Sequence, residues 1–560
     1  MMLPNFFIFL LSYILITFSV LGYGLFFGRL INKKSFTCNL GYSGLVGIFF
    51  LILYSYISHF FINHGFIHNS ILVITGVFLS AFFIIKNPER KFFFLLLLIF
   101  LILFIGLVIF KTHDDFPYYH FPYSYYLTQH PTYIGVGIFN HGFRTPSSIF
   151  YLNSIFYLPF IKYYMFLIPS ILILGFANLV LISKIIKSFN LTKTDYLSHL
   201  CLLSLIFINI FFYRIQEHGT DRSAQILVFI LFIDLLIFVS FRPNFKNNIS
   251  NILIILGIII SLKSFYILYL SFFIPIFFIL YKEKKLSLII ETVKRKIFLI
   301  FILLLLLVLL VNFLNSGCLI YPVSLTCFDN LGWSIGSSEV VKMNDWYELW
   351  SKAGATPNFR VENPEVYIKN FNWFFNWFET YFFNKVSDFL LGLIFLLACI
   401  FSIFYSKSKY VSKHNKYIFY IYLFIIILFL EWFYNHPALR YGGYCIIALL
   451  IFFPASLALG RFKNSDKNLK IKFFSIITIV FIIFFTRNIT RIIDEKKKYN
   501  YNPIKNIYFR IDENHFRIDD DFKKLIRNYK NCNFNNNECD LNLRPKLDKF
   551  NKTYIFLKND

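Results

Sequence analysis

Apolar residues in this chain come in long runs that are separated by short polar loops. Residues 6–27 and 92–110 are two examples, and a helix of about 20 apolar residues is long enough to cross a lipid bilayer. Such runs recur up to residue 486, which predicts a succession of membrane-spanning helices. The residues that follow are polar and mixed in charge, so we expect a transmembrane domain over 1–486 and a separate tail over 487–560.

The charge of the loops alternates along the chain. Basic loops are typical of the cytoplasmic side of a membrane. The other loops would then face outward, including the two longest, 111–148 and 315–386, and so would both ends of the chain. Lys and Arg concentrate in every second loop, at residues 29–34, 86–91, 184–193, 242–246, 282–296, 407–416 and 461–472.

The apolar stretch 250–281 is too long for one crossing and lies between two basic loops. We interpret it as a tight helical hairpin with Lys263 at its outer turn. The fold class is then an all-α polytopic membrane protein of about 13–14 transmembrane helices. The alternative is one long tilted helix, which would place every later loop on the opposite side of the membrane.

Composition agrees with a membrane protein, since 57% of the residues are hydrophobic, 15% are charged and the mean hydropathy is +0.62. The formal net charge of +25 is of the size found in nucleic-acid-binding proteins. Here, however, the Lys and Arg residues lie next to apolar runs, where they face anionic lipid. We therefore expect the lipid bilayer as a partner, and no nucleic acid.

Four cysteines form two close pairs in segments that are predicted to lie outside. Cys318 and Cys327 share the loop 315–386, and Cys532 and Cys539 share the tail. An oxidising compartment would allow a disulfide in each pair. The alternative is that all four are free thiols.

The two large outer segments differ in character. The tail has strand-like runs at 506–511 and 553–557 around the helix-like sequence DDDFKKLIRNYK, which predicts a small extracytoplasmic α+β element. The loop 315–386 is rich in tryptophan, which suits either anchoring at the membrane interface or stacking on sugar rings. Anchoring is the commoner role. The tryptophans are Trp333, Trp346, Trp350, Trp373 and Trp377.

Unusual polar residues collect in the predicted outer loops. Asp114 and Asp115 directly follow an apolar run, and ionisable residues at a membrane boundary are functional candidates. The next outer loop contains RIQEHGTDR and the last contains YNHPALRYGGY. The candidate binding residues are His120, Glu217, His218, Asp221, Arg222, Lys263, His436, Arg440 and Tyr441.

These residue types suit glycosyl transfer. A carboxylate in a partly dry site can act as a general base on a hydroxyl, and arginine can hold a phosphate while its glycosyl bond breaks. An inverting transferase that uses a polyprenyl-phosphate sugar needs both groups. Asp115 would cap a helix that starts at Pro117, which leaves Asp114 as the preferred base. Each residue also has a structural alternative, as a helix cap, a lipid anchor or part of a solvated loop.

The sequence DDFPYYH at 114–120 resembles the signature of the GT-C glycosyltransferases, a superfamily that includes protein mannosyltransferases, aminoarabinose transferases and oligosaccharyltransferases. The resemblance covers the layout of the first several helices. It implies a many-helix fold, an external catalytic Asp and an isoprenoid-phosphate donor. No cofactor is certain, but some members hold a divalent metal with acids from two external loops, for which Asp114 or Asp115 with Glu217 or Asp221 are the candidates here. The segments GCLIYPVSLTCF and NHPALRYGGY are also similar to a family of uncharacterised bacterial inner-membrane proteins.

We therefore expect a glycosyltransferase that modifies an envelope glycan, lipid or protein at the outer face of the bacterial inner membrane. One alternative is an O-antigen polymerase or ligase, which uses Arg and His in a large outer loop such as 315–386. The other is a transporter, which would need charged or broken helices at mid-membrane. Asp234 is the clearest isolated acid within a predicted helix.

Overall fold

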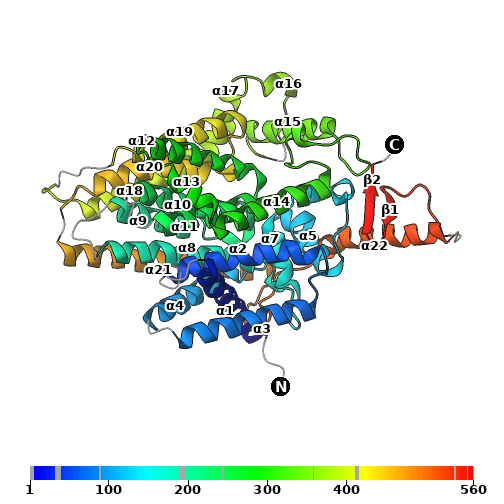
Figure 1. The fold of residues 1–560 in the computed structure, drawn as a ribbon, viewed down its shortest axis with the longest axis horizontal. Helices are drawn as coiled ribbons and strands as arrows, with labels where there is room; N and C mark the ends of the chain where they lie inside the picture. The colour runs from blue at the N-terminus through cyan, green and yellow to red at the C-terminus, as the bar shows by residue number, and fades with distance from the viewer. Residues whose placement is uncertain are drawn as a thin grey trace.

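The computed structural model describes residues 5–31, 39–86, 90–189, 196–240, 245–356, 359–409, 415–463, 465–534, 538–551 and 553–558. Within these ranges the regular structure is helical, except for one two-stranded sheet near the C-terminus. Most of the long helices run in one general direction, and the sheet lies at one end of the molecule (Figure 1). The described residues therefore confirm the predicted helical fold, with this small sheet as its β-structure.

Four helices open the chain, and small residues bring the first three together. Gly22 lies against the backbone of Gly76, and Gly24 lies against the backbone of Ser43, so neither glycine leaves room for a Cβ atom. Close backbone contacts of this kind drive helix packing in membranes, where lipid competes for apolar surface. These helices are α1 (Asn5–Ile31), α2 (Leu40–His59), α3 (Phe66–Ile85) and α4 (Arg90–Leu107).

The centre of the bundle consists of α2 and four later helices. Helix α8 is almost completely buried, because it contacts α2, α4, α9 and α10. Asp234 is buried on α10 and has two partners, Lys184 Nζ at 2.7 Å and the hydroxyl of Tyr42, which donates at 2.6 Å. These partners account for an acid inside a helix. The later helices are α8 (Ile168–Ser188), α9 (Tyr196–Ile210), α10 (Gly219–Ser240) and α11 (Phe245–Leu262).

The second half of the chain adds helices around this centre. Helix α14 packs on α11, α20 packs on α9 and α19, and the long helix α21 packs on α9 and α4. These helices are η7 (Ser264–Phe272), α12 (Phe273–Lys282), α13 (Ser287–Val293), α14 (Lys296–Ser316), α18 (Ser387–Phe404), α19 (Ile418–Asn435), α20 (Gly443–Leu459) and α21 (Asp466–Tyr499).

Short helices occupy the segments between the long ones. The first group, after α4, is η2 (Phe116–His120), α5 (Phe121–Gln129), α6 (Val136–Phe139), η3 (His141–Arg144), α7 (Ser148–Ile155) and η4 (Tyr163–Met165). The second group is η5 (Ile215–His218), η8 (Ser324–Thr326), α15 (Ser337–Lys352), α16 (Pro364–Tyr367), α17 (Phe374–Trp377), η9 (Phe378–Val386) and η10 (Leu439–Tyr441).

The helices have the character of a multi-pass membrane protein. In the described part of the chain, ten are long and apolar enough to cross a membrane. The stretch 250–281 is divided as predicted, because α11 ends at Leu262 and Lys263 has an extended backbone, with φ −151° and ψ 128°. Four shorter apolar helices accompany the ten, at Phe93–Leu107, Tyr196–Ile210, Asn248–Leu262 and Gly443–Leu459.

The tail contains α22 (Glu513–Asn533) and an antiparallel hairpin of β1 (Lys546–Phe550) and β2 (Thr553–Leu557), in which Lys546 lies opposite Leu557. The predicted helix and the second predicted strand are confirmed. The predicted strand at 506–511 is wrong, because this segment packs its apolar side chains on the helices instead of on a sheet. Phe509, for example, lies 5.5 Å from the ring of Phe116.

Two further predictions concern the tail and the cysteines. Helix α21 continues without a break to Tyr499, so the predicted boundary at residue 487 lies within this helix. Both predicted disulfides are present, Cys318–Cys327 and Cys532–Cys539.

Candidate active site

Four side chains from distant parts of the chain form one cluster of alternating charge. They are Asp115 just before η2, Asp221 in the first turn of α10, Lys263 between α11 and η7, and Arg440 in η10. Arg440 Nη2 lies 3.3 Å from Asp115 Oδ2, and Arg440 Nε lies 3.2 Å from Asp221 Oδ2. Lys263 Nζ forms an ion pair with the other oxygen of Asp221. We call these four residues the charge cluster.

Arg440 is the centre of the charge cluster. Its guanidinium lies 5.7 Å from the ring of Trp350 and 5.8 Å from that of Tyr441, at distances typical of cation–π contacts. Burial alone would lower the pKa of this guanidinium, but Asp221, with Tyr441, Tyr119 and Asp115, outweighs this effect and raises the pKa above its ordinary value. Arg440 therefore carries a permanent positive charge at a site that both carboxylates share.

Buried hydrogen bonds hold the backbone of Arg440 in place. The amide of Gln225, on α10, donates to the carbonyl oxygen of Arg440 at 3.0 Å and accepts from the backbone N–H of Cys445 at 3.2 Å. Gly442 has φ +103°, a left-handed conformation that lets the chain turn from η10 into α20. Gln225 thus connects α10, which carries Asp221, to the segment that carries Arg440.

A second set of hydrogen bonds holds the end of α11, where Lys263 lies. The hydroxyl of Ser147 donates to the carbonyl oxygen of Leu262 at 2.7 Å. The hydroxyl of Ser261 donates to that of Ser148 at 3.0 Å. Both contacts join α11 to the start of α7, so the loop after α4 helps to place Lys263.

Asp115 does not cap a helix, which corrects the prediction made from Pro117. Helix η2 begins at Phe116, but no backbone N–H of this helix donates to the Asp115 side chain. Its carboxylate instead contacts Arg440 and, at 3.5 Å, His113 Nδ1. Burial lowers the pKa of His113, an effect that Asp115 opposes, so the imidazole is neutral at pH 7.

Asp114 lies outside the charge cluster. Its side chain is 77% exposed and pairs with Lys111 at 3.2 Å. The side chain of Asp115 is 33% exposed. Of the two predicted acids, the structure therefore places Asp115, and not the preferred Asp114, beside the cationic groups.

The RIQEHGTDR loop divides between two places. Asp221 joins the charge cluster, whereas Glu217 pairs with Arg214 Nη2 at 2.6 Å. Arg222 donates from Nη1 to the carbonyl oxygen of Arg214 at 2.9 Å. Glu217 and Arg222 therefore belong to a neighbouring group, and the side chain of His218 lies outside the described residues.

The remaining predicted residues lie close to the charge cluster. Within the described residues, the buried Nε2 atom of His120 has no hydrogen-bond partner, and burial lowers the pKa of His120 to about 3. Burial also lowers the pKa of His436 to about 4, with a smaller contribution from Lys352. Burial raises the pKa of Tyr441 to about 12, against the effect of Arg440. All three are uncharged at pH 7.

Of the candidate metal ligands, Asp115 and Asp221 come together, but the guanidinium of Arg440 occupies the position between them. Asp114 pairs with Lys111, Glu217 with Arg214, and Asp221 with Lys263 and Arg440, so each acid has its own cationic partner. Among the described residues no group of three or more His, Cys, Asp or Glu side chains could hold a metal ion. These residues do not fit the divalent metal that the resemblance suggested.

Several residues near the charge cluster were missed from the sequence. Trp350 was noted only as one of many tryptophans, yet it stacks on Arg440 and lies 5.7 Å from Tyr441. Ser147 gave no signal and Gln225 gave a weak one, because single polar residues inside or beside apolar runs are common. The spacing of Gln225 one helical turn after Asp221 was the only available clue.

A family described as a domain of unknown function, DUF8201, matches residues 6–447. The chain belongs to this family. The matched DUF8201 region includes all four residues of the charge cluster, whereas α21 and the tail lie beyond it. No curated protein and no solved structure matches the chain.

Proposed function

We propose that this protein is a membrane glycosyltransferase that takes a sugar from a polyprenyl-phosphate donor. The observation that carries the proposal is the charge cluster, which brings a half-buried carboxylate together with two cations. Such a cluster can accept a proton from a hydroxyl and can neutralise a phosphate, which are the two requirements of this reaction.

In the proposed step, Asp115 is the general base. It takes the proton of an acceptor hydroxyl while the hydroxyl oxygen bonds to the anomeric carbon of the sugar. The bond between that carbon and the phosphate oxygen breaks, and polyprenyl phosphate leaves. A single displacement of this kind inverts the configuration at the anomeric carbon.

Arg440 and Lys263 would stabilise the leaving phosphate, whose charge grows in the transition state. Arg440 contacts Asp115 through Nη2 and Asp221 through Nε. A donor phosphate that takes over the Nη2 contact would free Asp115 to act as a base, while Asp221 keeps Arg440 and Lys263 in place. In the resting state Arg440 Nη2 contacts Asp115, and in the reacting state it contacts the donor phosphate.

Aromatic residues beside the charge cluster support a sugar as the transferred group. Trp350 and Tyr441 lie at 5.7 Å from each other and both contact Arg440. Indole and phenol rings stack readily on the apolar faces of sugars, and their edges donate hydrogen bonds. Helix α15, which carries Trp350, would then contribute to the binding of the sugar.

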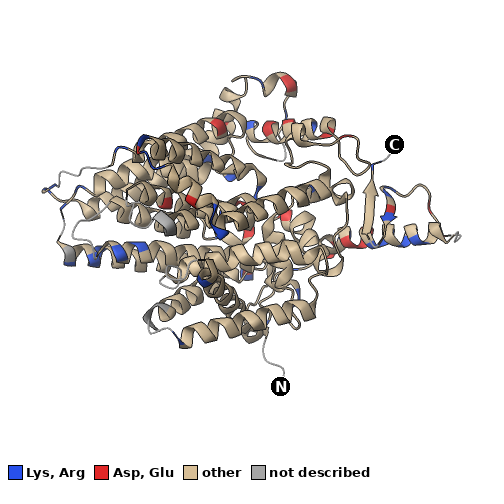
Figure 2. Ribbon diagram, in the orientation of Figure 1, with Lys and Arg blue, Asp and Glu red and all other residues tan. Residues whose placement is uncertain are grey.

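We place the charge cluster at the outer face of the bacterial inner membrane, in a GT-C-like bundle of about 13–14 crossings. The support is the distribution of charge. Lys and Arg residues are concentrated at the start of α21, at the end of the molecule opposite to the C-terminal sheet (Figures 1 and 2). The predicted cytoplasmic loops 407–416 and 461–472 also meet, since the N–H of Lys463 donates to the carbonyl of Ser408 at 2.9 Å.

The adjacent acids provide a matched test of the proposed base. Asp115→Asn keeps the size of the side chain but removes its basicity, so we expect sugar transfer in membranes to fall roughly a hundredfold. Asp114→Asn makes the same chemical change one residue earlier, on an exposed side chain, and should leave at least half of the activity. The measurement is transfer from a radiolabelled polyprenyl-phosphate sugar.

Two outcomes of these assays would contradict the proposal. Full transfer by the double variant Asp114→Asn, Asp115→Asn would show that neither acid is the base. A larger loss in Asp114→Asn than in Asp115→Asn would show that the charge cluster is not the reacting centre.

A further inference from the structure

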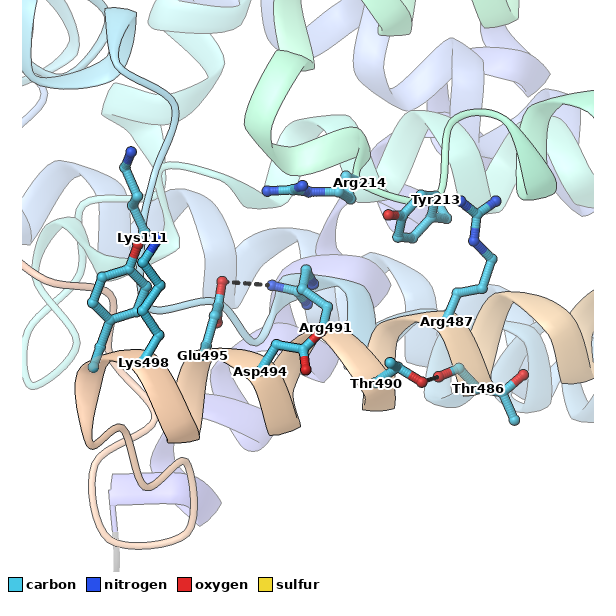
Figure 3. Close-up of a pocket in the computed structure, with 11 residues that line it drawn as sticks. Lys111, Tyr213, Arg214, Thr486, Arg487, Thr490, Arg491, Asp494, Glu495 and Lys498 are labelled. Atoms are coloured by element: carbon cyan, nitrogen blue, oxygen red, sulfur yellow. Dashed lines mark hydrogen bonds and ion pairs between the residues drawn. The ribbon is translucent and has the colours of Figure 1, made fainter. Parts of the chain in front are cut away.

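A separate basic pocket lies along the second half of α21. It has a volume of about 430 Å³ and is bounded by α21, by Lys111 after α4 and by Tyr213 and Arg214 after α9. Figure 3 shows the guanidinium groups of Arg487 and Arg491 extending from α21 toward Arg214 and Tyr213. Its charged lining residues are Lys111, Arg214, Arg487, Arg491, Asp494, Glu495 and Lys498.

The helical repeat explains why α21 contributes so much of the lining. Arg487, Arg491, Glu495 and Lys498 are three or four residues apart, which places them on one face of the helix. Hydrogen bonds hold this face on its neighbours. Arg491 Nη2 donates to the carbonyl of Val108 at 2.7 Å, and Glu495 accepts from the N–H of Phe110 at 3.0 Å.

The cations of the pocket outnumber its acids, five to two. Arg491 forms an ion pair with Glu495, at 3.5 Å, and donates to the carbonyl oxygens of Ile105 and Val108 at the end of α4 and just after it. Lys111 and Arg214 pair with Asp114 and Glu217, two acids outside the lining. Arg487 and Lys498 are exposed and have no carboxylate partner within the described residues. The pocket therefore has cationic groups to offer to an anion.

The position of the pocket at the ends of apolar helices indicates which kind of anion it binds. Three apolar helices end around it, since α4 ends at Leu107, α9 ends at Ile210 and the apolar part of α21 gives way to charged residues at Arg487. Lys and Arg at such a position lie at the level of lipid headgroups and attract anionic lipid.

An exposed apolar stripe leads away from the pocket along the same helix. Ile479 and Ile482 are 53% and 56% exposed. Ile482, Thr486 and Thr490 are spaced four residues apart, so the stripe continues directly into the pocket lining. This arrangement offers an apolar surface to a hydrocarbon chain and a basic pocket to its head.

We propose that this pocket binds the phosphate of a membrane lipid headgroup, with the acyl or prenyl chain along Ile482 and Ile479. Arg487 and Lys498 make the principal contacts with the phosphate, and Lys111, which is exposed and paired with Asp114, belongs to the same lining. This site is separate from the charge cluster and does not depend on the proposed transfer reaction.

Binding of short-chain phosphatidylglycerol to the purified full chain in detergent, measured by native mass spectrometry, tests the proposal. We expect the wild type to bind this anionic lipid more tightly than phosphatidylcholine. Arg487→Gln with Lys498→Gln should weaken the binding about tenfold. The control Lys496→Gln with Lys497→Gln removes the same number of charges from the last turn of α21, beside Lys498 but outside the pocket lining, and should change binding less than twofold.

A second variant guards against a folding defect, because Arg487 also donates to the carbonyl of Ile210 at 2.6 Å. Lys111→Gln with Lys498→Gln alters only exposed lysines and should weaken phosphatidylglycerol binding in the same direction. Equal losses in the pocket variants and the control, or no loss in any of them, would overturn the proposal.

Competition distinguishes the sources of the phosphate. Displacement of phosphatidylglycerol by polyprenyl phosphate at a lower concentration would identify the head of a prenyl lipid as the preferred occupant, whereas weaker displacement would identify a phosphoglyceride. If inorganic phosphate displaces the lipid as effectively as either of them, the pocket binds a free anion and the lipid assignment is wrong.

Discussion

At the scale of single residues, Asp221 is the group on which the charge cluster depends. Its side chain is only 4% exposed and contacts both Lys263 and Arg440. Lys263 and Arg440 are themselves 23% and 34% exposed. A buried carboxylate between two cations offsets a repulsion that would otherwise act across the site. Asp221 thus acts as a buried counter-charge, while the side chain of Asp115 is 33% exposed and more accessible to a substrate.

Removal of this counter-charge should destabilise the protein. We expect Asp221→Asn to reduce the free energy of unfolding by about 3 kcal/mol, because two partly buried cations lose their shared partner. Asp345→Asn, on an exposed part of α15, should change it by less than about 0.5 kcal/mol. Thermal unfolding in detergent measures both. Equal midpoints for the two variants would show that Lys263 and Arg440 are neutralised by other groups.

At the scale of elements, one buried amide connects η10 to α10 and to the start of α20. Gln225 is fully buried and satisfies both the carbonyl of Arg440 and the N–H of Cys445. Ser223 lies on the same helix and is equally buried, but its hydroxyl has no hydrogen-bond partner within the described residues. The two residues are equally buried on the same helix but differ in the hydrogen bonds that their side chains form.

This difference gives a matched pair of substitutions. Gln225→Leu leaves a buried carbonyl and a buried N–H unpaired, so we expect a loss of about 2 kcal/mol in stability together with reduced sugar transfer, since Arg440 shifts. Ser223→Ala should change stability by less than about 0.5 kcal/mol and leave transfer intact. Thermal unfolding and the transfer assay measure the two effects. Normal transfer by a destabilised Gln225→Leu protein would argue against a positioning role.

Some elements were predictable from the sequence and others were not. Apolar runs identified the long helices, and the charge of Lys263 identified the break after α11. The extension of α21 to Tyr499 was missed, because its last turns are polar and are held by contacts with α4. Strand β1 was missed because KLDKF is mostly charged and is stabilised only by its pairing with β2.

At the scale of the whole molecule, the sequence identified the residues of the charge cluster but not their partners. Their grouping in predicted outer loops was sufficient to select Asp115, Asp221, Lys263 and Arg440. Which of two adjacent acids faces Arg440 depends on the backbone of one turn, and hydrophobic periodicity does not specify that turn. The separation of Glu217 from Asp221 likewise follows from the η5 helix between α9 and α10.

The orientation of the whole bundle can be measured with reporter fusions. Alkaline phosphatase is active only outside the cytoplasm, so we expect activity after Ser148, Lys385 and Lys530. Fusions after Lys86 and Lys294 should be inactive, because these residues belong to basic loops that are held inside. Activity of a fusion at Lys86 or Lys294 would reverse the orientation.

The pairing of β2 with the loop after α5 has a consequence for the order in which the protein is made. The N–H of Ile134 donates to Tyr554, and the N–H of Phe556 donates to Ile134, at 3.0 and 2.9 Å. Residue 134 leaves the ribosome long before residue 556, and at about 5–20 residues per second this interval is roughly 20 to 80 seconds. During that time the loop lacks its final backbone partner. A chain whose synthesis stops before β2 therefore contains all the described helices but lacks this backbone pairing, so we expect its loop after α5 to be cleaved more readily by proteases.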